Sequence, residues 1–557
     1  MKLTNSEQYC LDILGSGINY AKVLVNTIMS LGSSTSAKTP VQITESVYFQ
    51  YGYTSLSDVI AHLSAHLPTT DGKCADLFAL SQYLSYINMP YYELFPNDES
   101  RLLGIYKLQT DVKALRKPHS PRLKGRQYVY TNNNTIQGNR SIIGGYYYSY
   151  INLGYHPPVA QGGTRWSLPF SIYRLAVDDD DIHIAYVQIA SVMRDDKLPF
   201  KTAQLVINAA DSAYCQPRFI APCAEFVNLV NIIRIRFASA VWTQPEVDPQ
   251  EARKKGAARS YGKAYYLHTD TQRLCFNPHT NQHEIKEQDS IFLKKEQEYL
   301  TFESTTTRGR KITIELWRWH DLLLRTQDKC SMKDKPFDLF AVRVTDTKTG
   351  KKLFKNELFA GIFGEKRREV SLLQAYENYR HRFDIEVHNR FSNQALLLDK
   401  FQSPIIEHID NWAAIVLLTY WLLFIASHDT EAFCFPWERY DPKFKNQIEP
   451  IITNITEPNV EPKSESIQQA KNIEYNNKKL FNELPSKPIA ANDKPLMSVA
   501  QTRKAVHRLF STFDLSPSTP KAINNGKGRT KGQIQTKRTK HPILKKNQVE
   551  LNTRANV

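Results

Sequence analysis

Three side chains suited to phosphate chemistry lie within the eight residues YRHRFDIE. Tyr379, Arg382 and Glu386 stand at positions i, i+3 and i+7, which an α-helix places along one face. A guanidinium can grip a phosphate, a phenol can stack or donate beside it, and a carboxylate can bind a metal ion. The spacing therefore predicts a helix face equipped for a nucleic-acid backbone. The competing interpretation is an amphipathic helix that carries three common residues on its solvated face.

A further carboxylate stands at the end of a strand-like run. Asp211 follows the apolar residues LVINAA, so it would lie where a buried strand ends. An aspartate in that place can also cap the next turn. Cutting a phosphodiester without a covalent enzyme intermediate requires metal ions, and these require carboxylates from distant parts of the chain. Asp211 is therefore a candidate metal ligand.

The spacing Tyr-x2-Arg-x3-Glu resembles the signature of one branch of DDE transposases, the enzymes that cut and paste bacterial insertion sequences. The residues after Glu386, NRFSNQALLLDKFQSP and then HIDNWAAIVLLTYWLLFIA, are similar to that family's pattern as well. The segment SAYCQPRFI after Asp211 is similar to the segment that follows the family's second aspartate. The resemblance implies metal-dependent DNA cleavage and strand transfer.

The resemblance also implies roles for individual residues. Asp111, in KLQTDVKALRKPHSPRLKGRQYVY, matches the position of the family's first aspartate. Asp111, Asp211 and Glu386 would then hold two Mg²⁺ ions, with Mn²⁺ able to substitute. Tyr379, Arg382 and Arg390 would contact DNA.

The chain departs from the family's pattern at two places. Gln109 and Thr110 make the end of the first strand more polar than usual, and Lys113 stands where a small hydroxyl residue is common. The signature also continues to a lysine seven residues after its glutamate, and this chain has Asn393 there. An amide can hydrogen-bond a phosphate but supplies no charge.

The elements that must position these residues follow an α/β pattern. Residues 1–98 have helical periodicity and predict an N-terminal helical domain with a DNA-binding role by analogy. Aromatic and β-branched residues then predict three strands, a helix at His183–Arg194, a strand ending at Asp211 and a fifth strand at 232–242. This is the order of an RNase H-like fold with acids at the ends of its first and fourth strands, although several α/β folds share the order.

The predicted RNase H-like core is interrupted. Residues 99–242 form its first part, residues 243–348 read as a mainly β insertion, and residues 349–436 form its second part with the helix of Glu386. The resembled transposase branch carries a β insertion in the same place. Residues 437–557 read as a polar linker and a basic, largely disordered arm, interrupted by a short amphipathic helix at 499–510.

Charge favours a polyanionic partner. The 557 residues carry a net charge of +16, which nucleic acid or an anionic membrane would satisfy. The acid-free stretch 521–549 would bind the phosphate backbone, unless it is a merely solubilising tail. Its predicted DNA-binding residues are Lys527, Arg529, Lys531, Lys537 and Arg538.

Other features exclude several classes of protein. Residues 1–20 lack the continuous apolar core of a secretory signal, which predicts a cytoplasmic protein. The resemblance implies a bacterial, nucleoid-associated one. The apolar run 412–426 is shorter than the ~20 residues of a bilayer span, so it predicts a buried helix and no membrane partner. Seven scattered cysteines without a CxxC pair predict reduced thiols. No GxxxxGK[ST] motif indicates ATP use.

The resemblance implies a cut-and-paste DNA transposase that acts on double-stranded DNA, as a homodimer on paired element ends. The alternative from another class is a catalytically silent DNA-binding regulator derived from such an enzyme, which the Asn393 departure favours. A metal-dependent nuclease without strand transfer would use the same site residues.

Overall fold

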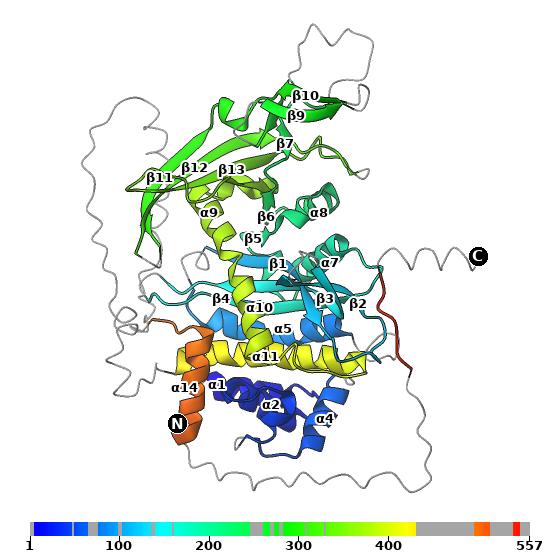
Figure 1. Cartoon of the computed structure of the whole chain (residues 1–557). Helices are drawn as coiled ribbons and strands as arrows, with labels where there is room; N and C mark the ends of the chain where they lie inside the picture. The colour runs from blue at the N-terminus through cyan, green and yellow to red at the C-terminus, as the bar shows by residue number, and fades with distance from the viewer. Residues whose placement is uncertain are drawn as a thin grey trace.

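The protein's structure is a computed structural model. It describes residues 5–46, 49–64, 76–97, 103–134, 140–158, 161–245, 260–267, 272–277, 282–306, 309–327, 330–430, 495–512 and 539–545. Within these ranges the chain is a mixed α/β protein with one large mixed sheet. Most of the helices lie against one half of this sheet (Figure 1). The other half, formed by the strands between residues 298 and 363, is called the β-strand half below.

The large sheet has ten strands. Along it the strands follow the order β11-β12-β13-β14-β6-β5-β1-β3-β2, and β4 also pairs with β3. Their bounds are β1 Ile105–Arg116, β2 Gln127–Asn134, β3 Arg140–Tyr155, β4 Trp166–Leu175, β5 Leu205–Ala210, β6 Leu229–Ile235, β11 Glu298–Thr305, β12 Lys311–Leu322, β13 Phe337–Asp346 and β14 Leu358–Phe363. Two small hairpins lie outside it: β7 (Ala240–Trp242) with β8 (Ala264–Tyr266), and β9 (Gln272–Asn277) with β10 (Gln282–Glu287).

The direction of the strands changes along the sheet. β3 runs antiparallel to both β1 and β4, whereas β1, β5 and β6 run parallel to one another. All six residues of β5 are buried, as expected for a central parallel strand covered on both faces. The carboxyl ends of β1 and β5 therefore meet at one edge of their shared pairing, where loops and helices can approach.

Helices cover both faces of the β1–β6 half of the sheet. Their bounds are α1 Asn5–Gly15, α2 Ala21–Ser33, α3 Pro40–Ile43, α4 Tyr53–His62, α5 Leu77–Leu94, α7 Asp181–Arg194, α8 Pro217–Cys223, α9 Leu372–His381, α10 Asp384–Gln394, α11 Ile406–Asp429 and α14 Val499–Thr512. In Figure 1 α11 lies between the sheet and the N-terminal helices α1, α2 and α4. The N-terminal helices thus share one hydrophobic core with the sheet through α11.

The prediction of a buried apolar helix is confirmed. α11 is long and apolar enough to cross a membrane by length and composition, but its apolar stretch is wholly buried inside the protein. Trp412 and Trp421 are completely buried in it. Because neighbouring helices and β4 surround α11, its composition is that of a core helix.

The first strand differs from its prediction. β1 does not end at Asp111 but continues to Arg116, so the prediction that Asp111 ends the strand was wrong. The cause is pairing with β3, whose register extends from Leu108↔Leu153 to Arg116↔Gly145. The β2 edge strand was also missed, although its Tyr-Val-Tyr sequence has strong β propensity.

The predicted β-rich segment is continuous with the main sheet. β11, β12 and β13 form antiparallel neighbours, and β14 joins them to β6. In Figure 1 these strands make up the upper half of the molecule, and α9 packs against them. The segment therefore extends the sheet that carries β1 and β5.

Two separate C-terminal segments contact the folded body. The amphipathic helix predicted at 499–510 is observed as α14, which packs on α2 and α11. Farther along the chain, the Tyr128 N–H donates to the Leu544 carbonyl and the Leu544 N–H donates to the Arg126 carbonyl. The second segment thereby lies along β2. The remainder of the predicted arm lies outside the described residues.

Replacement of Gly163 by Ala should displace the segment that carries α14. Gly163 has a φ of +101°, and a Cβ there would overlap the Leu496 backbone, to which the Thr164 N–H donates over 2.8 Å. We expect faster amide exchange in residues 495–512. Gly350→Ala is the matched control, because Gly350 has a φ of +66° but open space around it. Equal protection of α14 in both variants would contradict the expectation.

Candidate functional site

Asp111 and Asp211 lie next to each other on neighbouring parallel strands. The last pair in the β1–β5 register is Thr110↔Ala210, so each aspartate is the first residue after the shared pairing. β5 ends there, and Asp211 caps the short 3₁₀ turn at Ser212–Tyr214 by accepting from the Ser212 N–H over 2.5 Å. The capping interpretation of Asp211 is thus correct, and the second carboxylate oxygen is left for other contacts.

The face of β1 that carries Asp111 points toward α9 and α10. Gln109 donates to the His381 carbonyl over 2.9 Å, and Lys113 donates to the Asn389 carbonyl over 3.1 Å. Alternate residues of a strand share a face, so Asp111, between Gln109 and Lys113, faces the chain between His381 and Asn389. That stretch contains Arg382 and Glu386.

The predicted continuous helix through YRHRFDIE is interrupted. α9 ends at His381 and α10 begins at Asp384, with i→i−3 hydrogen bonds from the N–H groups of Arg382, Phe383, Ile385 and Glu386. The Gln109 amide supplies a physical reason, because it donates to the His381 carbonyl that Ile385 would otherwise use. The prediction of one helix face was therefore wrong: Tyr379 and Arg382 are buried, whereas the Glu386 side chain is 51% exposed.

Arg382 is a buried cation at the centre of this arrangement. It is 5% exposed, and its guanidinium lies 4.5 Å from the Phe383 ring centroid and 5.9 Å from that of Tyr379. Its Nη2 lies 3.6 Å from Glu386 Oε1. A buried guanidinium needs negative partners, and the solvated-face interpretation of Arg382 is excluded by this burial.

The groups that shift the pKa of Asp111 indicate that the three acids lie near one another. Burial raises the pKa of Asp111 to about 6. Arg382 and the Val112 N–H oppose that rise, whereas Asp211 and Glu386 add to it. All three acids therefore lie near enough to interact electrostatically, with Arg382 as the counter-charge for Asp111.

Two tyrosines border the acids. Burial raises the pKa of Tyr379, while Arg382 and Arg234 act in the opposite direction and Asp211 adds to the rise. Burial also raises the pKa of Tyr214, with contributions from Asp111 and Asp211. Both phenols thus remain protonated donors at neutral pH, beside the carboxylates.

The fit to a metal ion is partial. Carboxylate oxygens from three elements are the ligands that Mg²⁺ takes. Burial is the main cause of the raised pKa of Asp111, with Asp211 and Glu386 adding to it, and a bound cation would stabilise the charged form. As they lie, however, no three Asp, Glu, His or Cys residues in the described ranges are gathered closely enough to hold an ion. Glu386 instead pairs with Arg382.

The other predicted contact residues are placed as follows. Arg390 is exposed on α10, one turn beyond Glu386. Asn393 follows on the same helix, and its Oδ1 atom is buried without a hydrogen bond. The arm residues Lys527, Arg529, Lys531, Lys537 and Arg538 lie outside the described residues.

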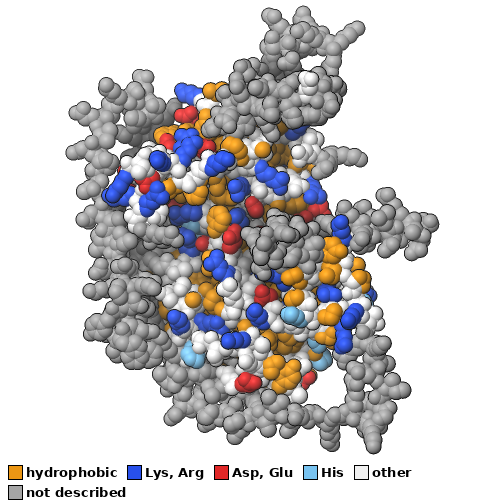
Figure 2. Space-filling view, in the orientation of Figure 1, with side chains coloured by type: hydrophobic (Ala, Val, Ile, Leu, Met, Phe, Trp, Pro, Cys, Tyr) orange, Lys and Arg blue, Asp and Glu red, His pale blue; other side chains and the backbone are white. Residues whose placement is uncertain are grey.

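A cavity of about 660 Å³ adjoins the site. Tyr379 and Phe383 bound it on the α9 side, and β12, β13 and β14 supply the opposite wall. Arg234 and Arg380 also line it. Figure 2 shows Lys and Arg side chains spread over the β-strand half of the molecule, with fewer acidic ones among them. The surroundings are therefore suited to an anionic ligand with apolar parts.

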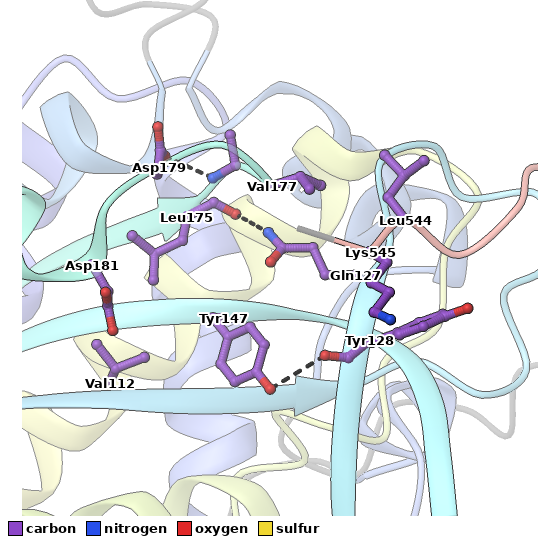
Figure 3. Close-up of a pocket in the computed structure, with 11 residues that line it drawn as sticks. Val112, Gln127, Tyr128, Tyr147, Leu175, Val177, Asp179, Asp181, Leu544 and Lys545 are labelled. Atoms are coloured by element: carbon purple, nitrogen blue, oxygen red, sulfur yellow. Dashed lines mark hydrogen bonds between the residues drawn. The ribbon is translucent and has the colours of Figure 1, made fainter. Parts of the chain in front are cut away.

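A smaller cavity lies on the opposite face of β1 from Asp111. It measures about 360 Å³, and Val112, Tyr147 and Asp181 line it together with Leu544 and Lys545 of the C-terminal segment (Figure 3). Because Val112 follows Asp111 in the strand, the two side chains point to opposite faces. This cavity is separate from the site of the three acids.

A buried polar network behind Asp111 was missed by sequence reasoning. Ser167 donates to Gln109 Oε1 over 2.5 Å, and Asn152 Nδ2 lies 2.9 Å from Ser167 Oγ and 3.2 Å from His388 Nδ1. The network connects β1, β3 and β4 to α10. The polar residues Gln109 and Thr110 at this point of β1 were its signal in the sequence.

Gln109→Leu should shift the Glu386 segment. Without the amide, the His381 carbonyl can accept from the Ile385 N–H and restore a regular helix, while Ser167 loses a buried partner at a cost of about 1–3 kcal/mol. We expect slower amide exchange at Ile385, whose N–H would then bond the His381 carbonyl in a regular helix. Gln127→Leu is the matched control, since Gln127 donates to the Leu175 carbonyl away from the site. Equal exchange at Ile385 in the two variants would contradict the positioning role.

No protein-family model matches the chain, and no curated protein matches it.

Proposed function

We propose that this protein is a DNA transposase that cuts and joins DNA by the metal-dependent DDE mechanism. The observation that carries the proposal is the convergence of Asp111 from β1, Asp211 after β5, and the Arg382–Glu386 segment between α9 and α10. These residues come from three distant parts of the chain. The electrostatic effect of Asp211, Glu386 and Arg382 on Asp111 supports a shared site for one phosphate group.

The strand arrangement supports an RNase H-like core. The order β4-β3-β1-β5-β6 combines antiparallel β4-β3-β1 pairing with parallel β1-β5-β6 pairing, and α7 connects β4 to β5. The β-rich segment between Asp211 and Glu386 supports the expected insertion. We propose that its strands, which extend the sheet beyond β6, lie beside the bound DNA.

The proposed chemistry assigns each residue a task. Two Mg²⁺ ions, when bound, activate the attacking oxygen and stabilise the leaving one. Asp111 and Asp211 would provide oxygen ligands from the sheet, and Glu386 would provide the third carboxylate from α10. Arg382 offsets the negative charge of Asp111, and the Tyr379 and Phe383 rings hold its guanidinium in place.

The proposed reaction has two steps. A water molecule attacks the phosphodiester at the element end, its oxygen joins the phosphorus, and the bond to the 3′ oxygen breaks. The freed 3′ hydroxyl then attacks a phosphodiester of the target DNA: its oxygen forms a new bond to phosphorus, the bond to the target's own 3′ oxygen breaks, and that oxygen takes up a proton to leave a 3′ hydroxyl. We propose a homodimer on paired element ends in the bacterial cytoplasm, with the net charge of +16 favouring DNA binding.

One alternative function has an observation of its own. The three acids are not gathered into a closed metal-binding group, and Asn393 stands in place of the signature's lysine. Both features favour a catalytically silent, transposase-derived protein that binds DNA and regulates transposition. Such a protein would bind the element ends without cutting them.

The test is cleavage of a DNA fragment that carries the flanks of this gene, with Mg²⁺, by the natural chain and by Asp211→Asn. Asp58→Asn, at an exposed position on α4, is the control. We expect cutting at the element boundary by the natural chain and the control only, and joining of the cut ends to a target plasmid. Binding without cutting would favour the regulator, and cutting without joining would indicate a nuclease.

A further inference from the structure

A segment near the C-terminus pairs with the chain that enters β4. The Thr164 N–H donates to the Leu496 carbonyl over 2.8 Å, and the Leu496 N–H donates to the Gly162 carbonyl over 3.3 Å. The Trp166 indole N–H donates to the Met497 carbonyl over 3.0 Å. Leu496, Met497 and Trp166 are all buried. This C-terminal segment is therefore part of the core that surrounds β4.

The same entrance to β4 contacts the start of α10. Arg165 lies between the two residues that bond the C-terminal segment, and its Nε donates to Asp384 Oδ2 over 3.1 Å. Asp384 is the first residue of α10 and stands two residues before Glu386. The Arg165 side chain is 37% exposed and that of Asp384 is 16% exposed. The main chain around Arg165 is thus bonded to the C-terminal segment, while its side chain is bonded to the helix of Glu386.

A second contact joins the C-terminal segment to α10 farther along the helix. Arg503, on α14, is 9% exposed, and its guanidinium lies 6.0 Å from the ring centroid of Phe391 on α10. Arg503 also donates to the carbonyl of Ser34, at the end of α2, where a helix carries partial negative charge. A cavity of about 230 Å³ lies between α10 and the first turn of α14. Because side chains do not fill this space, the contacts of Arg165 and Arg503 are what join α10 to its surroundings on this side.

Glu386 depends on such outside support. Its side chain is 51% exposed, and its Oε1 lies 3.6 Å from Arg382 Nη2, which is longer than a hydrogen bond. The helix is interrupted between His381 and Asp384, so α9 does not fix the first turn of α10. Contacts from other elements can therefore set the position of this carboxylate.

We propose that Arg165 and the C-terminal segment 495–503 position α10, so that docking of this segment sets the place of Glu386 beside the two aspartates. The task of Glu386 rests on the proposed function, whereas the coupling of the segment to α10 does not. Arg165 is a positioning residue, because it carries the effect of the backbone bonds at the entrance to β4 to the first turn of α10.

Amide exchange tests the coupling. Gly163→Ala should release the C-terminal segment, since its Cβ would overlap the Leu496 backbone, and should speed exchange in both 495–512 and α10 by about fivefold or more. Arg165→Gln should speed exchange in α10 by about two- to fivefold, the range of a partly exposed ion pair, and should leave 495–512 protected. The double variant should exchange in α10 no faster than Gly163→Ala alone.

Matched controls exist for both changes. Gly350→Ala introduces a Cβ at a positive φ in open space. Arg194→Gln breaks another exposed ion pair, that of Arg194 on α7 with Glu225. Both controls should leave exchange in α10 unchanged.

Cleavage assays test the effect on Glu386. Arg165→Gln and Asp384→Asn break the same ion pair from opposite sides, so each should slow cleavage of bound DNA by about tenfold, because small displacements of a catalytic group are costly. DNA affinity should stay the same in both variants, and Arg165→Lys, which keeps the charge, should retain most of the rate. Weaker DNA binding in Arg165→Gln alone would indicate a direct phosphate contact and overturn the positioning role.

The outcomes separate the coupling from the proposed function. Equal exchange in α10 in Gly163→Ala and Gly350→Ala would overturn the coupling, whether or not the natural chain cuts DNA. Faster exchange in α10 in Gly163→Ala only, with a natural chain that does not cut DNA with Mg²⁺, would confirm the coupling and contradict the proposed function.

Discussion

Asp111→Asn should abolish cleavage and make the metal-free protein more stable at neutral pH. Loss of one of three proposed metal ligands should reduce the rate by about 10³-fold or more, several kcal/mol of transition-state stabilisation. The raised pKa of Asp111, about 6 instead of 3.8, corresponds to about 3 kcal/mol by which its charge destabilises the fold. The amide removes that charge and keeps the shape of the side chain.

The stabilising effect of Asp111→Asn should depend on pH. A carboxyl whose pKa is higher in the folded state binds its proton more tightly there, so the unfolding free energy decreases as pH rises from about 4 to about 6. Urea unfolding in EDTA should show Asp111→Asn as more stable than the natural chain at pH 7.5 and equally stable at pH 4. Asp58→Asn should follow the natural chain. An Asp111→Asn variant that is less stable at pH 7.5 would contradict the conclusion that the buried charge of Asp111 destabilises the fold.

Asp338→Asn should be the most destabilising single-charge change in the β-strand half. Asp338 is fully buried and accepts from Arg318 Nη2 over 2.7 Å, from Arg318 Nε over 3.1 Å and from the Asp321 N–H over 3.2 Å. Arg318 also donates to the Val370 carbonyl, immediately before α9. Leaving the buried guanidinium without its carboxylate should lower the unfolding free energy by about 3–5 kcal/mol.

The measurement is the urea midpoint at pH 7, with Asp196→Asn as control. Asp196 pairs with Lys201, but its side chain is 81% exposed, so its loss should change the free energy of unfolding by at most about 1 kcal/mol.

His320 lies 3.0 Å from Asp338. Burial alone would lower the pKa of His320, but hydrogen bonds to Asp338 and Glu298 raise it. That stabilisation is present at low pH and is lost as pH rises through the raised pKa, and Asp338→Asn should weaken this dependence. Equal midpoints for the two variants would contradict the prediction.

Local patterns in the sequence were sufficient to predict many elements. The apolar run of α11 predicted a buried helix, the 3.6-residue periodicity of 183–194 predicted α7, and the run LVINAA placed Asp211 after a strand. Each of these signals is contained in a short window. In each case the apolar residues visible in the sequence are the ones that the fold buries.

The features that were predicted wrongly from the sequence depend on contacts between residues far apart in the chain. β1 extends past Asp111 because β3 pairs along its whole length, and the helix at Arg382 is interrupted where Gln109 takes the His381 carbonyl. The burial of Arg382 likewise depends on the strands beneath it. For the candidate site, the sequence predicted the residue types, whereas only the fold brings Asp111, Asp211 and Glu386 near one another.

Metal rescue by a sulfur ligand tests the central claim most directly. Thiolate ligands disfavour Mg²⁺ and tolerate softer metals such as Mn²⁺, so Asp211→Cys should fail to cut the gene-flanking DNA with Mg²⁺ and should regain activity with Mn²⁺. Asp211→Asn should stay inactive with both metals. This pattern would establish Asp211 as a metal ligand in DNA cleavage. An Asp211→Cys variant that cuts equally well with both metals, or an Asp211→Asn variant that retains full activity, would contradict the account.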